Sequence, residues 1–133
     1  MECDDEIAIV ERAIRAVGEL DIDGLFELIA DDIVLDLPYR HDGGEPRLVG
    51  DVARSFFRAM PKLFSALPFH DVTIHGKLPS GTVVAEYRSD GITRAGLRYS
   101  NHYVAFFEVR AGRIAQWREF FDPTVVAASF PSR

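Results

Sequence analysis

Residues 99–123 read YSNHYVAFFEVRAGRIAQWREFFDP, and this stretch decides the fold. The pattern predicts two long strands joined by a turn at Ala111-Gly112. Because side chains alternate along a strand, each strand presents one mainly aromatic face that also carries a polar group. The residues that share these faces are Tyr99, Asn101, Tyr103, Ala105 and Phe107 on the first strand, and Trp117, Glu119 and Phe121 on the second. An apolar wall with one carboxyl group and a few hydrogen-bonding groups is typical of a small-molecule pocket.

The composition limits the classes of protein to consider. The length of 133 residues suits a single domain over residues 1–133, and 47% hydrophobic residues can supply its core. A formal net charge of -6 argues against nucleic acid or an anionic membrane as a partner, because both require a basic face. The acidic N-terminus lacks the order of a signal peptide, and no apolar run approaches the roughly 18 residues of a membrane span. We therefore expect a soluble cytoplasmic protein.

The order of the predicted elements indicates an α+β fold. Apolar residues at helical spacing predict helices over about 5–20, 23–29 and 51–64, with a short strand at 33–37 between the second and third. Strands are expected at 72–75, 82–93, 99–110 and 114–121. A strongly curved antiparallel or mixed sheet needs its concave face covered, and three N-terminal helices can cover it. The result is a cone with a pocket between the sheet and the helices.

Two sets of residues carry a resemblance to a known superfamily. They are Ala30-Asp31-Asp32-Ile33-Val34 with Gly50, and Tyr99-Ser100-Asn101-His102-Tyr103 with Gly112-Arg113-Ile114 and Arg118-Glu119-Phe120-Phe121-Asp122-Pro123. In this order they resemble the nuclear transport factor 2-like superfamily, which includes ketosteroid isomerases, SnoaL-like polyketide cyclases and limonene epoxide hydrolases. The second set is most similar to the phenazine biosynthesis proteins of the A/B type. The resemblance implies the cystatin-like fold of that superfamily.

The chain departs from the superfamily's acid–base residues at two places. Ketosteroid isomerases have a general-base Asp just before the proline that ends the first strand, where this chain has Leu37; Asp36 should point to the opposite face. Their second Asp would fall near Tyr103 or Val104, neither of which has a carboxyl group, so the resemblance does not imply steroid isomerisation by that mechanism. In the phenazine proteins the Glu of an Arg-Glu-Phe segment is the acid–base group, and Glu119 matches it. Their histidine on the third helix corresponds to Phe57 here.

Glu119 is the first candidate for catalysis. A carboxyl group between Trp117 and Phe121 loses solvation, so its pKa should rise and it can act as a general acid or base. The alternative is a carboxylate paired with Arg118 or Arg88 at an edge of the sheet or at an interface.

Asn101 and Tyr103 are candidates for hydrogen bonds to a substrate carbonyl or enolate oxygen. The alternative is that they only satisfy polar groups within the core, as buried Asn and Tyr side chains usually do. The expected substrate-binding residues are Tyr39, Arg40, Phe57, Met60, Phe107, Trp117 and Phe121, where Arg40 either holds a substrate carboxylate or is an ordinary surface arginine. The histidines lack metal-ligand spacing, and His70 and His75 should face opposite sides of a strand. We expect no metal and no cofactor.

The residues and the resemblance together favour a small cofactor-independent SnoaL-like enzyme. It would catalyse an isomerisation, cyclisation or condensation of a hydrophobic carbonyl or imine compound. A non-catalytic ligand-binding or dimerisation module is the main alternative, and limonene-type epoxide hydrolysis through Asp36, Arg88 and Asp90 is another. Apolar residues on the outer face of the long strands, Val104, Phe106 and Phe120, predict a homodimer through the sheet. The tail from Val125 either closes the pocket or crosses to the partner.

Overall fold

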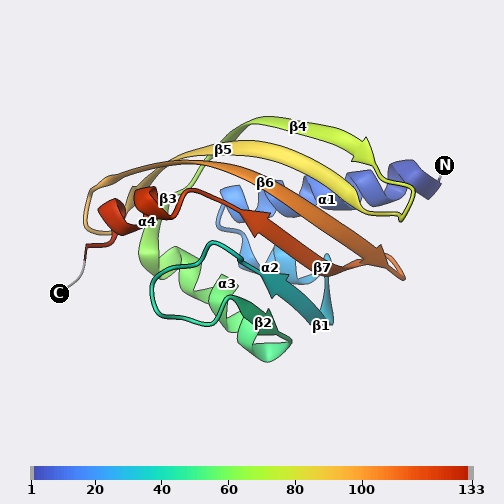
Figure 1. The fold of residues 1–133 in the computed structure, drawn as a ribbon, viewed down its shortest axis with the longest axis horizontal. Helices are drawn as coiled ribbons and strands as arrows, with labels where there is room; N and C mark the ends of the chain where they lie inside the picture. Colours follow the sequence, from blue (N-terminus) through green and yellow to red (C-terminus); the bar gives the residue numbers. More distant parts are fainter. Residues whose placement is uncertain (1, 132–133) are drawn as a thin grey trace.

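A computed structural model describes the backbone of residues 2–131 and the side chains of residues 5–131. The elements in chain order are α1 (Glu2–Gly18), α2 (Ile22–Phe26), β1 (Ile29–Asp36), β2 (Arg47–Val49), α3 (Asp51–Leu63), β3 (Phe64–Ala66), β4 (Phe69–Lys77), β5 (Val83–Thr93), β6 (Arg98–Arg110), β7 (Arg113–Phe120) and α4 (Pro123–Ser129) (Figure 1). None of the helices in this described part is both long and apolar enough to cross a membrane.

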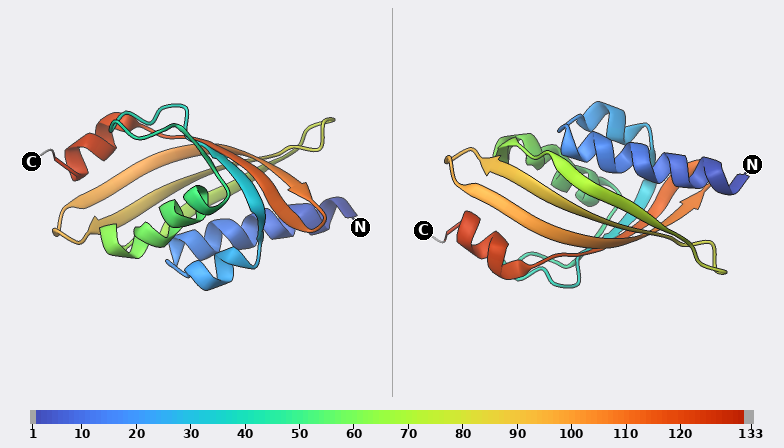
Figure 2. Two further views of the ribbon diagram at one scale, coloured as in Figure 1. Left: turned by 90° about the horizontal axis from the view of Figure 1, so that it is seen from below. Right: turned by 90° about the horizontal axis from the view of Figure 1, so that it is seen from above.

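The strands form one curved, mixed sheet in the order β2-β1-β7-β6-β5, with β3 and β4 both pairing with the far edge of β5. β1 and β7 run parallel, and the other pairs are antiparallel. Figure 2 shows α1, α2 and α3 on the concave side of this sheet. The predicted α+β fold with three covering N-terminal helices is therefore confirmed. A fourth helix, α4, was missed by the sequence reasoning.

The hairpin of β6 and β7 carries the residues that the sequence pattern placed on the concave face. It turns at Ala111-Gly112, where φ is 52° and 79°, the left-handed pair that a tight hairpin turn requires. The inward residues predicted for β6 are all buried, and Trp117 of β7 is buried too. Glu119 and Phe121 are half-buried. The alternation of side chains thus places the aromatic face of the hairpin on the concave side.

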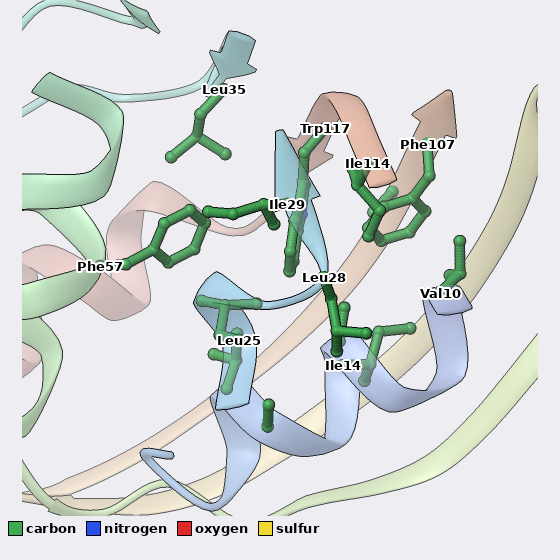
Figure 3. Close-up of a cluster of buried hydrophobic side chains, with 14 of the residues drawn as sticks. Val10, Ile14, Leu25, Leu28, Ile29, Leu35, Phe57, Phe107, Ile114 and Trp117 are labelled. Atoms are coloured by element: carbon green, nitrogen blue, oxygen red, sulfur yellow. The ribbon is translucent and has the colours of Figure 1, made fainter. Parts of the chain in front are cut away.

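The core fills the space between α1 and the sheet. Val10 and Ile14 are four residues apart on α1, so both point toward the strands, where Phe107 is completely buried (Figure 3). The ring centroid of Phe107 lies 4.8 Å from that of Trp117, which in turn lies 5.3 Å from that of Phe57 on α3. This row of three rings connects the core to α3.

The prediction that His70 and His75 face opposite sides of β4 is wrong. The register of β4 against β5 shifts between His70 and Thr73, and Asp71 has a φ of 53°. One extra residue in a strand reverses the faces that follow it. His70 therefore lies beside Arg88, and the Nε2 of His75 lies 2.8 Å from a carboxylate oxygen of Glu86, both on the outer face.

Candidate functional site

A cavity of about 520 Å³ opens between α3, α4 and the inner face of the sheet. That volume is within the usual range for small-molecule sites. Most of its wall is apolar, and the residues that form the two helical sides are Phe56, Phe57 and Met60 of α3 and Val126, Ala127 and Phe130 near α4. Its polar groups come from the strands, namely Glu119, Tyr99 and Tyr103, and from the mouth, namely Arg40, His41 and Asp42.

Glu119 reaches the cavity because of its register in the sheet. It pairs with Ala105 of β6, which pairs with Ala85 of β5. The small side chain of Ala105 leaves room for Tyr87, the next inward residue of β5, to reach across β6. The Tyr87 hydroxyl donates a hydrogen bond to Oε1 of Glu119, and the indole Nε1 of Trp117 donates to the same oxygen over 3.2 Å.

The two carboxyl oxygens of Glu119 therefore have different surroundings. Oε1 accepts both hydrogen bonds, while Oε2 accepts none from any residue that the structure describes. Burial in the apolar cavity raises the pKa of Glu119, and the hydrogen bonds from Tyr87 and Trp117 oppose that rise only in part. A carboxyl group with one oxygen anchored and the other unbonded can exchange a proton with a bound molecule.

A second polar group of the cavity is a row of hydroxyls. Ser89 Oγ lies 2.9 Å from the hydroxyl of Tyr103, which donates to the hydroxyl of Tyr99 over 3.1 Å. The ring of Tyr103 stacks on that of Tyr87 with centroids 5.1 Å apart, which fixes its position. Burial raises the pKa values of Tyr99 and Tyr103, so both phenols stay protonated at neutral pH.

Asn101 lies behind these tyrosines and does not line the cavity. Its amide nitrogen donates to Tyr99 and to the carbonyl of Asp122, and its amide oxygen accepts from the backbone N–H groups of His102 and Asp122. All four hydrogen bonds stay within the protein. The structure thus favours the alternative in which Asn101 satisfies polar groups of the core and ties β6 to the start of α4.

Replacing Asn101 with Leu should therefore destabilise the protein. The change leaves buried polar partners without hydrogen bonds, which costs about 1–3 kcal/mol in the free energy of unfolding. Urea unfolding would measure this loss. Ser100→Ala is the matched control, because the neighbouring Ser100 is exposed and should have little effect. Equal stability of the two variants would contradict the structural role of Asn101.

The remaining predicted binding residues divide into two groups. Phe57, Met60, Trp117 and Phe121 line the cavity, as does Arg40 at its mouth. Tyr39 and Phe107 do not. Tyr39 is 54% exposed with its ring against Phe120 outside the cavity, and Phe107 belongs to the core.

Arg40 is held by its own loop. Its guanidinium forms an ion pair with Asp42 at 2.8 Å and donates to the carbonyl of Glu45 over 2.9 Å. The hydrogen bond from Arg40 also lowers the pKa of Asp42, which keeps that carboxylate charged. A substrate carboxylate would have to compete with Asp42 for this arginine, so the structure gives little support to the proposed carboxylate-binding role.

Sequence reasoning missed Tyr87, Ser89 and the role of Tyr99. Alternation along residues 82–93 places Tyr87 and Ser89 on the same face, which was the available signal. Their relevance depends on the register of β5 against β6, where Tyr87 pairs with Tyr103 and Ser89 with Asn101. Hydrophobic patterning alone does not determine that register.

Residues 10–117 match the family model of the SnoaL-like domain. The chain belongs to the SnoaL-like domain family. The uncharacterized protein YesE of Bacillus subtilis strain 168 is 32% identical to this SnoaL-like chain over 114 residues, covering 84% of this chain and 78% of YesE. The resemblance to the superfamily inferred from the motifs is thereby confirmed.

Solved structures of similar proteins support the same conclusion. A crystal structure of a Bacillus subtilis protein provisionally described as an isomerase has a TM-score of 0.89 and 28% identity, covering 98% of this SnoaL-like chain and 95% of that one. A protein of Xanthomonas campestris provisionally described as a polyketide cyclase has a TM-score of 0.80 and 22% identity, covering 97% and 98% of the two chains. The second likeness concerns the fold alone.

The residues that would serve epoxide hydrolysis in this SnoaL-like protein lie apart from the cavity. Asp36 faces away from it and pairs with Arg47 at 3.4 Å. Arg88 and Asp90 line a different groove of about 400 Å³ next to α4, where Asp90 forms an ion pair with Arg98 at 3.1 Å. Because Asp36, Arg88 and Asp90 do not meet, the structure does not support the epoxide hydrolase alternative. Leu37, at the place of the general-base Asp, is part of the cavity wall.

Proposed function

We propose that this SnoaL-like protein is a cofactor-independent enzyme that moves a proton on a hydrophobic carbonyl or imine compound. The observation that carries the proposal is the Glu119 carboxyl group, which lies in an apolar cavity with Oε1 held by two donors and with Oε2 bonded to none of the described residues. General acid–base groups are most effective when burial shifts their pKa toward the working pH. The raised pKa of Glu119 fits that requirement.

The proposed step is a proton transfer at a carbon atom next to the carbonyl. Ionised Glu119 accepts the proton on Oε2, and the electron pair of the broken C–H bond moves to the substrate oxygen as an enolate. The protonated Glu119 then returns the proton. Return of the proton to a different carbon completes an isomerisation. In a cyclisation or condensation, the enolate carbon instead attacks a second carbonyl group, and the oxygen of that group takes the proton from Glu119. Tyr87 and Trp117 hold the carboxyl group in place throughout.

The proposal is tested with 2-tetralone, a small bicyclic ketone with an acidic C–H bond next to its carbonyl. The protein is added to 2-tetralone in D2O, and the exchange of this proton for deuterium is followed by nuclear magnetic resonance. We expect exchange faster than in buffer alone. Quenching of Trp117 fluorescence by the ketone without faster exchange would favour the binding-module alternative, to which Phe57 in place of a histidine partner also points. Trp117 is the single tryptophan, so its signal reports on the cavity.

The raised pKa of Glu119 also predicts how stability depends on pH. A group whose pKa is higher in the folded protein stabilises it below the unfolded pKa of about 4.3, and that stabilisation is lost as the pH rises through the folded value. Glu119→Gln has no such titration. The free energy of unfolding of the wild type should therefore fall relative to the variant as the pH rises from 4 to 8, as measured by urea unfolding. If the difference in free energy of unfolding between wild type and variant stayed constant with pH, or changed in the opposite direction, the raised pKa of Glu119 would be contradicted.

We further propose that two copies of the chain meet through the outer face of the sheet. Val104, Phe106 and Phe120 lie on this face and are each only half-buried in the single chain. Arg118 lies over the rings of both Phe106 and Phe120, at 4.7 and 5.6 Å from their centroids, which leaves an apolar patch with a charged centre. Sedimentation at micromolar concentration should show a dimer that Phe106→Glu converts to a monomer. A monomeric wild type would rule this interface out.

A further inference from the structure

We infer that the hydroxyl group of Tyr99 donates a hydrogen bond to the oxygen or imine nitrogen of the bound compound. Tyr99 would then be the second polar group that contacts the ligand. It would donate a hydrogen bond to the acceptor atom of the ligand, whereas Glu119 would take the proton from carbon. The inference rests on the proposed site but not on its reaction, since it concerns only how the ligand is held. The Tyr99 contact defines the class of ligand more narrowly, as an apolar molecule that carries a hydrogen-bond acceptor.

The first step is the orientation of the Asn101 amide. Its oxygen accepts hydrogen bonds from the backbone N–H groups of His102 at 2.8 Å and Asp122 at 2.9 Å, and a backbone N–H can only donate. The amide nitrogen must therefore be the atom that lies 3.0 Å from the hydroxyl of Tyr99. Since an amide NH2 group has no acceptor, the Tyr99 oxygen receives this hydrogen bond.

The second step is the hydroxyl of Tyr103. It donates to the Tyr99 oxygen over 3.1 Å, so that oxygen receives a second hydrogen bond. Ser89 Oγ in turn accepts from the backbone N–H of Asn101 at 3.2 Å and lies 2.9 Å from the Tyr103 hydroxyl, to which it can donate its own proton. Hydrogen bonds arranged head to tail strengthen one another. The chain of donors runs from Ser89 through Tyr103 and ends at Tyr99.

The third step is the proton of Tyr99 itself. Its oxygen accepts twice, and none of the residues that the structure describes accepts a hydrogen bond from it. The side chain lines the cavity, and its ring packs against those of Phe64 and Phe130, with centroids 5.0 and 6.3 Å away. Burial raises the pKa of Tyr99 and keeps this proton on the oxygen. A buried donor without an internal acceptor is suited to a ligand oxygen.

The test compares two probes that differ only in the acceptor. 2-Acetylnaphthalene carries a carbonyl group, and 2-isopropenylnaphthalene has a methylene group in its place. Tyr99→Phe should raise the dissociation constant of the ketone by about 5- to 10-fold, the usual net value of one hydrogen bond, and leave that of the hydrocarbon unchanged. Equilibrium dialysis measures both constants. Equal loss for both probes, or no preference of the wild type for the ketone, would overturn the inference.

Infrared spectroscopy of the bound ketone gives a second readout. The carbonyl stretch of carbonyl-labelled 2-acetylnaphthalene should lie at lower frequency in the wild type than in Tyr99→Phe, because a hydrogen bond weakens the C=O bond. Tyr103→Phe keeps the Tyr99 donor but breaks the chain behind it, so the band should lie between the two. Tyr39→Phe is the matched control, since Tyr39 is outside the cavity. An identical band in all four proteins would contradict the inference.

The failure of this inference can be distinguished from failure of the proposed function. Weaker ketone binding in Tyr99→Phe together with no proton exchange in the wild type would support the Tyr99 contact and reject the enzyme. Faster exchange in the wild type with unchanged ketone binding in Tyr99→Phe would support the enzyme and reject the Tyr99 contact.

Discussion

Glu119→Gln should lower the protein-catalysed exchange of 2-tetralone by about 10²- to 10⁴-fold, the usual contribution of a positioned acid–base group. Glutamine has nearly the same shape, and its amide oxygen can accept the hydrogen bonds from Tyr87 and Trp117 that Oε1 accepts now. The remaining amide nitrogen cannot take up a proton from carbon. The variant should therefore keep the cavity and lose only the group that moves the proton.

The control for this variant is Glu108→Gln. Glu108 lies on β6 with an exposed side chain, so the same chemical change there should leave exchange at the wild-type rate. Ketone binding by Glu119→Gln, measured by equilibrium dialysis, should stay close to that of the wild type and so exclude a collapsed cavity. Exchange at the wild-type rate in Glu119→Gln would show that another group, or solvent, is the base.

Phe107→Ala should lower the free energy of unfolding by about 3–5 kcal/mol, the usual cost of removing a buried phenyl ring. The side chain is completely buried, and its ring packs against Trp117 with centroids 4.8 Å apart. Loss of the ring leaves a hole that the surrounding strands cannot fill, because β6 is paired on both sides by β5 and β7. Urea unfolding measures the change.

Phe106→Ala is the matched control, since Phe106 is the preceding residue on the same strand but lies on the outer, half-buried face. Phe106→Ala should lower the free energy of unfolding clearly less than Phe107→Ala does, when the protein is kept monomeric by dilution. The two variants remove the same type of side chain from neighbouring positions of one strand, so a difference between them reports the face of the sheet on which each residue lies. Similar losses for both variants would mean that Phe107 is less well packed than the structure shows.

Alternation along two strands was enough to predict which residues of the hairpin face the concave side. Asn101, Tyr103 and Glu119 are all on that face, because the side-chain period of a strand is independent of what it pairs with. The hydrogen-bond partners of those residues could not be predicted from the sequence. Tyr87 is 32 residues from Glu119 in sequence, and only the pairing of β5, β6 and β7 brings them together.

The role of Asn101 shows a second limit. Sequence alone left two uses open for its amide, and the choice depends on the backbone of Asp122, where the chain leaves the sheet and enters α4. That helix was itself missed, although Asp122 caps its N-terminus and Pro123 occupies its first turn, a common pattern at helix starts. The bulge at Asp71 has no comparable sequence signal, so the faces of β4 could not be assigned.

The polar groups that we propose to act on the ligand and the wall that shapes the cavity come from different parts of the chain. Glu119 and Tyr99 belong to strands that are paired on both sides, whereas much of the wall comes from α3, α4 and residues 40–42 at the mouth. Substitutions in those outer segments can therefore change which molecules are admitted without moving the carboxyl group or the hydroxyl. A lineage built on this plan can diversify in its ligands while keeping one chemistry, and laboratory evolution of new ligand preferences should begin at α3 and α4.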